Sequence, residues 1–202
     1  MSIKLGDKVA IVCCSNGQKQ RDLERINYLE KTIKENGLQP VFSNYIYEKE
    51  DVFSGTAKER AEALMSFYKD DEIKAIFDIS GGDVANGILP YLDFDVIAKS
   101  NKMFWGYSDL TTIINGIYAK TGKSSVLYQI RNLIYDDREQ QINDFKNTIM
   151  QKGTDLFQLK YKFVQKSSMQ GIVVGGNIRC FLKLAGTEFM PDLEGKILLL
   201  ES

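Results

Sequence analysis

Residues 102–122 read KMFWGYSDLTTIINGIYAKTG, an apolar segment that runs directly into an amphipathic one. The part at 102–107 is short and apolar, which is typical of a buried strand. After Ser108 the apolar side chains recur three and four positions apart, which predicts a helix that stops at Gly122. The apolar residues on this helix face are Leu110, Ile113, Ile114, Ile117 and Tyr118. The stretch therefore predicts a strand, a tight turn at Ser108 and a helix.

The same alternation of strands and helices runs along most of the chain. Short apolar segments predict further strands at residues 9–14, 40–42, 73–79 and 125–128. Amphipathic segments predict helices between these strands, and one of them begins with a capping box formed by Thr56 and Glu59. Strands that alternate with helices imply an α/β fold with a doubly wound, mostly parallel sheet.

Changes in pattern divide the chain into three parts. We expect an N-terminal α/β domain at residues 1–128, which carries the Ser108 turn, and a more charged connecting segment with a helix at residues 129–165. Residues 166–202 predict the beginning of a C-terminal α/β domain that the 202 residues do not complete. Its expected elements are a strand at 170–174, a turn at 175–177, a helix at 178–184 and a strand at 196–200.

Composition limits the classes of partner. Lys and Arg total 26 against 27 Asp and Glu, so the net charge of −1 gives no electrostatic footprint for nucleic acid or an anionic membrane. The N-terminus lacks the apolar stretch of a signal peptide, and no segment reaches the roughly 18 consecutive apolar residues of a membrane span. The 3 cysteines are an odd number, which argues against a disulfide framework and favours a cytoplasmic location.

Two residue types restrict the chemistry. Cys13 and Cys14 are candidates for metal ligands, but adjacent residues of a strand point to opposite faces, so a buried structural role is the better interpretation. Histidine is absent from the chain. Because histidine is the usual general base near neutral pH, this absence constrains every catalytic hypothesis.

The Ser108 turn has the context of a nucleophile elbow, in which a strand-to-helix turn presents the serine oxygen to a cleft. The backbone N–H of Asp109 would then face a developing oxyanion. The usual elbow has a second glycine two residues after the serine, and this chain has Leu110 there. The alternative is that Ser108 is only a helix N-cap, which is a common role of serine.

Two glycine pairs also follow expected strands. Gly82, within Ser80-Gly81-Gly82-Asp83, comes at the carboxyl end of a parallel strand, where it could offer a second oxyanion N–H. The alternative for this loop is a plain tight turn. The segment at 175–177, Gly-Gly-Asn, could bind an anion at a helix N-terminus, and the alternative there is a turn with Asn177 as N-cap.

Glu201 follows the apolar run at 197–200. A carboxylate at the end of a buried strand could orient a histidine, as the acid of a catalytic triad does. The alternative is a solvated charge at the end of a strand.

Taken together, these segments resemble the serine LD-carboxypeptidases and their relatives, the microcin C self-immunity peptidases. The resemblance covers essentially the whole chain and rests on the order and spacing of several motifs. They are SGGDVAN at 80–86, LPYLDFD at 89–95, FWGYSDLT at 104–111, VGGN at 174–177, LAGT at 184–187, MPDL at 190–193 and GKILLLE at 195–201.

The resemblance implies a Ser-His-Glu triad with Ser108 as nucleophile and Glu201 as acid, and an oxyanion hole formed by the N–H groups of Gly82 and Asp109. It also implies a flavodoxin-like or glutamine-amidotransferase-like N-terminal domain, a C-terminal domain that supplies the acid and the histidine, and a possible homodimer. Neither a metal nor an organic cofactor is expected. The implied substrate is an L,D-linked muropeptide or a peptidyl-nucleotide antibiotic.

Two features depart from the family's pattern. Many carboxypeptidase members have arginine before the glycine pair, whereas this chain has Ser80, which is closer to the immunity-like branch. The family's histidine lies well beyond the glutamate, whereas this chain ends at Ser202. We therefore expect that the 202 residues are truncated and inactive alone.

The alternative function is a non-catalytic α/β protein that binds a small anionic ligand. A third hypothesis, an interaction module, is weaker, because the sequence offers no exposed heptad, basic stripe or long apolar patch to support it.

Overall fold

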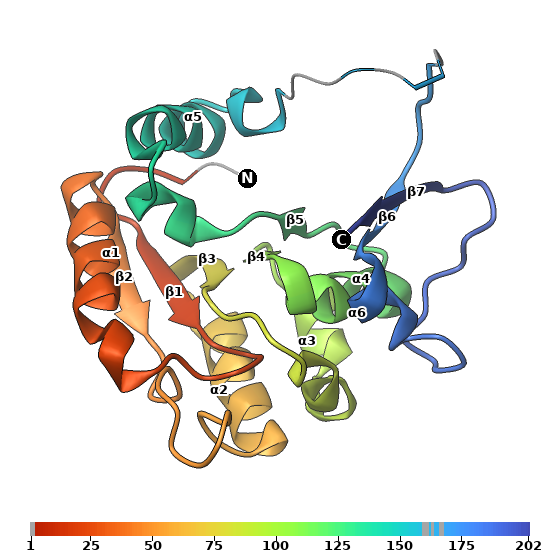
Figure 1. Ribbon diagram of the computed structural model, residues 1–202, viewed down its shortest axis with the longest axis horizontal. Helices are drawn as coiled ribbons and strands as arrows, with labels where there is room; N and C mark the ends of the chain where they lie inside the picture. The colour runs from red at the N-terminus through yellow and green to blue at the C-terminus, as the bar shows by residue number, and fades with distance from the viewer. Residues whose placement is uncertain (1–2, 159–161, 163, 166–167) are drawn as a thin grey trace.

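The computed structural model describes residues 3–158, 162, 164–165 and 168–202, and its architecture is α/β (Figure 1). Five parallel strands form a central sheet in the order β2-β1-β3-β4-β5. These strands are β1 (Lys8–Val12), β2 (Gln39–Phe42), β3 (Ile73–Asp78), β4 (Met103–Gly106) and β5 (Val126–Leu127). This is the strand order of flavodoxin-like folds, so the prediction of a doubly wound parallel sheet is confirmed.

Helices cover both faces of the central sheet. They are α1 (Leu23–Glu35), α2 (Ala57–Lys69), α3 (Phe94–Lys99), α4 (Thr111–Thr121) and α5 (Arg138–Met150). The cluster that contains Val12 and Ile113 fills the side of α2, α3 and α4. A second cluster, with Ile11 and Leu29, fills the side of α1 and α5. Neighbouring residues of β1 thus enter opposite clusters, as expected for a parallel strand buried on both faces.

Short 3₁₀ helices complete the connections. Those in the described part of the chain are η1 (Gln20–Asp22), η2 (Ala85–Tyr91), η3 (Ser108–Leu110), η4 (Ile130–Ile134) and η5 (Asp155–Phe157). The predicted capping box of α2 is confirmed, because Glu59 N donates to Thr56 Oγ1 at 3.2 Å and Thr56 N donates to Glu59 Oε2 at 2.8 Å. Of the helices that the structure describes, none has the length and apolar character that crossing a membrane requires.

A separate two-stranded parallel sheet pairs β6 (Val173–Asn177) with β7 (Ile197–Glu201). The predicted strand at 170–174 and turn at 175–177 are wrong in their limits. The strand begins later and contains Gly175 and Gly176, which pair with β7 although their φ angles are +109° and +130°. α6 (Ile178–Leu182) is shorter than predicted, because it ends in tight turns at Lys183 and Leu184. The division of the chain at residues 128 and 165 stays a prediction.

The buried side chain of Asn115 fixes β6 against α4. Asn115 Nδ2 donates to Gly175 O at 2.8 Å, and Asn115 Oδ1 accepts from Gly175 N at 2.9 Å. The next residue, Gly176, lies so close to α4 that a Cβ on it would be 2.6 Å from Thr111 Oγ1. This close approach, together with the positive φ, requires glycine there. The small sheet is therefore positioned by α4, the helix that follows the Ser108 turn.

We expect Asn115→Leu to lower the free energy of unfolding by about 2–4 kcal/mol, because each of the two polar groups of Gly175 left buried without a partner costs about 1–3 kcal/mol. The measurement is urea unfolding followed by circular dichroism. Asn101→Leu, at an exposed position, is the control and should change the stability by less than about 0.5 kcal/mol. Equal unfolding midpoints for Asn115→Leu and the parent would contradict this role.

Candidate active site

Ser108 stands at the turn between β4 and the helical segment formed by η3 and α4. Its φ of +58° lies in the left-handed region, which residues other than glycine seldom adopt. Residues held in this way gather at functional sites, where the surrounding structure maintains the strain. The Ser108 side chain does not cap the helices, because the N-caps of η3 and α4 are Tyr107 and Leu110. The N-cap interpretation of Ser108 is therefore wrong.

Gly106 and Leu110 make the turn tight. A Cβ on Gly106 would lie 2.6 Å from the Cβ of Leu110, so no larger residue fits without a shift. Leu110 is fully buried in the core on the α4 side of the sheet. An apolar anchor therefore occupies the position where the usual elbow has its second glycine.

The Gly81–Gly82 loop after β3 lies next to Ser108. A Cβ on Gly81 would be 4.0 Å from Ser108 Oγ, and Gly82 has a φ of +131°. Asn16, from the loop after β1, holds this segment on both sides: its N–H donates to Gly81 O at 3.2 Å, and its Oδ1 accepts from Asp83 N at 3.1 Å. A Cβ on Gly82 would lie 2.2 Å from Asn16 side-chain atoms, so a larger residue would displace that side chain, and the positive φ of Gly82 itself favours glycine.

A buried carboxylate anchors the base of the same loop. Asp78 accepts hydrogen bonds from Cys14 N at 2.8 Å, from Ser80 N at 2.7 Å and from Ser80 Oγ at 2.5 Å. Ser80 Oγ in turn accepts from Ser15 N at 2.9 Å. Burial raises the pKa of Asp78, although these hydrogen bonds act against the rise. Ser80 is thus a fully buried link between the ends of β1 and β3.

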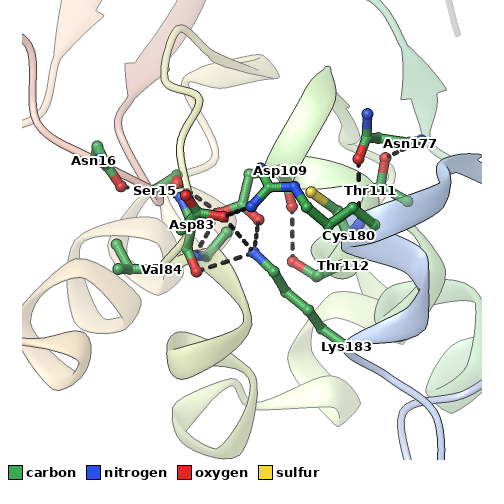
Figure 2. A network of polar contacts seen from close by, with 12 residues as sticks. Ser15, Asn16, Asp83, Val84, Asp109, Thr111, Thr112, Asn177, Cys180 and Lys183 are labelled. Atoms are coloured by element: carbon green, nitrogen blue, oxygen red, sulfur yellow. Dashed lines mark hydrogen bonds and ion pairs between the residues drawn. The ribbon is translucent and has the colours of Figure 1, made fainter. Parts of the chain in front are cut away.

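Asp109, the residue after Ser108, is buried and carries three hydrogen bonds (Figure 2). Asp109 Oδ2 accepts from Ser15 Oγ at 2.6 Å and from Ala85 N at 2.8 Å. Asp109 Oδ1 accepts from Lys183 Nζ at 2.7 Å. The side chain therefore joins the carboxyl end of β4 to the segments after β1, β3 and α6.

Glu201, the last residue of β7, lies beside the Ser108 turn. The Tyr107 hydroxyl donates to Glu201 Oε2 at 3.4 Å. Burial, and then the Glu201 carboxylate, raise the pKa of Tyr107, so the phenol keeps its proton near neutral pH. Glu201 Oε1 is buried and has no hydrogen-bond partner within the described part of the chain. Glu201 is thus half-exposed, with one carboxylate oxygen buried, and its role as acid or as a solvated charge stays a prediction.

Asn177 faces Glu201 across the small sheet, where the two residues are paired in register. Asn177 N donates to Thr111 Oγ1 at 3.0 Å, and Asn177 Oδ1 accepts from Cys180 N at 3.2 Å. The side chain caps α6, which is the N-cap role considered as an alternative for this segment. The backbone contact with α4 brings the end of β6 to the Ser108 turn.

Arg60 of α2 ties several loops together near this edge of the sheet. Its guanidinium donates to Gly55 O at 3.2 Å and to Ser15 O and Val84 O at 3.4 Å each. It also contacts the carbonyl oxygen of Cys14. Burial lowers the pKa of Arg60, although nearby acidic groups oppose the shift. The buried cation thus satisfies carbonyl groups from the segments before α2 and after β1 and β3.

A cavity of about 610 Å³ adjoins the same region. Its lining includes Arg60 of α2, Asp83 and Val84 from the segment after β3, and Lys49 and Phe53 from the loop before α2. The lining meets the segment after β3 at Asp83, the residue that follows Gly82. The cavity offers space for a small-molecule group at that segment.

The cysteine thiols are buried in the structure. Burial raises the pKa of Cys13 to about 12 and that of Cys180 to about 11, so both thiols stay protonated near neutral pH. Cys13 and Cys14 belong to opposite clusters of the core, which confirms their structural role. The described residues include no group of three or more side chains able to hold a metal ion.

The structure brings the four predicted site residues to one edge of the central sheet. Ser108 and Asp109 are adjacent in the turn, Gly82 belongs to the loop beside Ser108, and Glu201 reaches the turn through Tyr107. The sequence alone predicts no role for Asn16, Arg60, Asn115 or Lys183. A signal existed for Asn16, which follows a strand end in a polar loop. The other three lie within helices or their ends, where no local pattern sets them apart.

Known proteins resemble this chain in sequence. Residues 9–128 match the family model of the LD-carboxypeptidase N-terminal domain, and residues 170–202 match that of the LD-carboxypeptidase C-terminal domain. A putative carboxypeptidase of Treponema pallidum (strain Nichols) is 27% identical over 223 residues, which cover 98% of this chain and 66% of the relative. The microcin C7 self-immunity protein MccF of Escherichia coli is 30% identical over 181 residues, which cover 73% of this chain and 52% of the relative.

A solved structure also has a similar fold. The MccF-like protein from Bacillus anthracis strain Ames superposes with a TM-score of 0.86 at 27% identity, over 100% of this chain and 69% of that one. This chain thus spans between 52% and 69% of the length of these three proteins. Because the N-terminal family model alone matches more than half of the residues, this chain belongs to the LD-carboxypeptidase family.

Proposed function

We propose that this chain carries the nucleophile, the oxyanion hole and the triad acid of a cytoplasmic serine peptidase of the LD-carboxypeptidase type. The observation that carries the proposal is the Ser108 turn, where a serine with positive φ projects beside a glycine loop and caps no helix. In this proposal the N–H groups of Gly82 and Asp109 would serve as oxyanion donors beside this serine. A strained serine beside two N–H donors is the arrangement that acyl transfer requires.

In this mechanism Ser108 Oγ attacks the carbonyl carbon of an amide while a histidine takes its proton. The C–N bond then breaks, the amine leaves with that proton, and water hydrolyses the acyl-serine ester. The N–H groups of Gly82 and Asp109 would hold the negative oxygen of the tetrahedral intermediates. Glu201 would orient the histidine, and its buried, unpartnered Oε1 supports this role because such an oxygen needs a donor.

The sequence contains no histidine, so the proposal requires one from outside these 202 residues. Accordingly, we expect residues 1–202 alone to hydrolyse substrate at least about 10³-fold more slowly than the complete product of the gene, because the general base is missing. The measurement compares the two proteins in one hydrolysis assay. Comparable rates for both would contradict the triad.

The proposed substrates follow from the family and its members. The family description names an LD-carboxypeptidase, which supports an amide between an L-residue and a terminal D-residue in a muropeptide. The likeness to a microcin self-immunity protein supports a peptidyl-nucleotide instead. Ser80, where many carboxypeptidases have arginine, favours the second class. An L,D-tetrapeptide and a peptidyl-adenylate mimic are therefore the two substrates to compare.

Ser108→Ala should lower kcat/KM on the preferred substrate by at least about 10³-fold, since the nucleophile is lost. The experiment uses the complete gene product with both substrates, and covalent labelling by a fluorophosphonate probe reports on the serine directly. Ser124→Ala, at an exposed position 16 residues later, is the control and should leave both readouts unchanged. A folded parent protein that neither hydrolyses the substrates nor is labelled would favour the non-catalytic binding protein.

Glu201→Gln should lower kcat by about 10²–10⁴-fold, because the amide cannot stabilise the imidazolium as a carboxylate does. Glu194→Gln, at an exposed position, is the matched control and should have no effect. The measurement is kcat on the preferred substrate, with the folded fraction checked by circular dichroism. A Glu201→Gln protein with the parent's kcat would exclude Glu201 as the triad acid.

A further inference from the structure

Lys183 reaches two loops of the candidate active site at once (Figure 2). It lies directly after α6, far from both loops in sequence. Lys183 Nζ lies 2.7 Å from Asp109 Oδ1, 3.0 Å from Asp83 O and 3.3 Å from Asp83 Oδ1. One ammonium group, with its three donors, therefore bridges the segment after β3 and the turn after β4.

The two residues that Lys183 contacts both lie at the proposed oxyanion hole. Asp109 directly follows Ser108 and supplies one proposed oxyanion N–H, while Asp83 directly follows Gly82, which supplies the other. The N–H groups belong to separate loops, so their separation is not fixed by a shared strand or helix. We propose that Lys183 is a positioning residue, which sets the distance between the two oxyanion-hole donors by holding Asp109 and Asp83 together.

Burial makes this contact different from an ordinary surface ion pair. The Asp109 side chain is fully buried, and that of Lys183 is 20% exposed. Burial by itself lowers the pKa of Lys183, but the hydrogen bond and the charge of Asp109 outweigh it, and the pKa is raised. Lys183 therefore stays charged near neutral pH. Removing the ammonium would leave the buried Asp109 carboxylate with the two neutral donors on its other oxygen.

Arg179, within α6, provides an internal comparison. It forms an ion pair with Asp83, but the side chains of both are largely exposed, at 63% and 58%. Exposed pairs contribute little to a fold. Within the described part of the chain, Arg179 contacts the loop of Asp83 but not the turn of Asp109. If the bridge between the loops matters, Lys183 should affect turnover and Arg179 should not.

The inference rests on the proposed function, and its test uses the complete gene product on the preferred substrate. We expect Lys183→Met to lower kcat by about 10–100-fold, because a displaced oxyanion donor loses transition-state stabilisation. KM should change by less than about threefold, since the ground-state carbonyl depends less on these donors. Binding of a peptide boronate, whose tetrahedral adduct with Ser108 uses the oxyanion hole, should weaken in parallel with kcat.

Two variants separate positioning from general damage. Lys183→Arg keeps the charge and should recover kcat to within about fivefold of the parent, whereas Arg179→Met should stay within about twofold. All rates are normalised to the folded fraction measured by circular dichroism at the assay temperature. A fall in kcat that disappears on normalisation, or that is equal in Lys183→Met, Lys183→Arg and Arg179→Met, would overturn the inference.

Ser108→Ala in the same assay distinguishes the two levels of the proposal. Turnover that depends on Ser108 but is unchanged in Lys183→Met would overturn the role of Lys183 alone. Turnover that survives in Ser108→Ala would overturn the proposed function and the role of Lys183 with it. Ser108-dependent turnover that falls in Lys183→Met and recovers in Lys183→Arg is the expected result.

Discussion

The site depends on the buried carboxylate of Asp109. An ionised carboxylate removed from water is costly unless its oxygens are hydrogen-bonded. Here one oxygen is held by Ser15 from the loop after β1 and by Ala85 from η2, and the other by Lys183 after α6. Loops that meet at the carboxyl edge of a parallel sheet share no backbone ladder, so single hydrogen bonds connect them, and several of these come from side chains. Asp109 makes that connection next to the proposed nucleophile.

This connection also stabilises the unusual backbone of Ser108. A left-handed conformation costs a residue with a side chain about 1–2 kcal/mol, and it persists only where its neighbours are fixed. Leu110 fixes the turn from the core by packing on Gly106, and Asp109 fixes it through its hydrogen bonds. The left-handed backbone belongs to Ser108, and the hydrogen bonds that hold the turn belong to the next residue, Asp109. The Ser108 oxygen and the Asp109 N–H are therefore positioned together. An attacking oxygen and an oxyanion donor have to face the same carbonyl group, so this coupling suits acyl transfer.

Local sequence signals predicted the parts of the structure that depend on sequence neighbours. The Thr56 capping box and the strand-turn-helix at Ser108 belong to this class, because short-range spacing alone determines them. Contacts between distant residues had no such signal: Lys183 meets Asp109 across 74 positions, and Asn115 meets Gly175 across 60. For the same reason, the sequence predicts a turn at the glycine pair that in fact lies within β6. Its conformation follows from close packing on α4, which only the folded chain provides.

The proposed nucleophile and acid are positioned by one helix. α4 begins three residues after Ser108, and the side chains of its first two turns hold β6: Thr111 accepts from Asn177, and Asn115 pairs with Gly175. The parallel pairing of β6 with β7 then sets Glu201 opposite Asn177. The proposed nucleophile and the proposed acid are therefore both connected to α4. The short path from turn to helix to sheet explains how a small second sheet, whose three β7 leucines are all exposed, can hold Glu201 at a defined place.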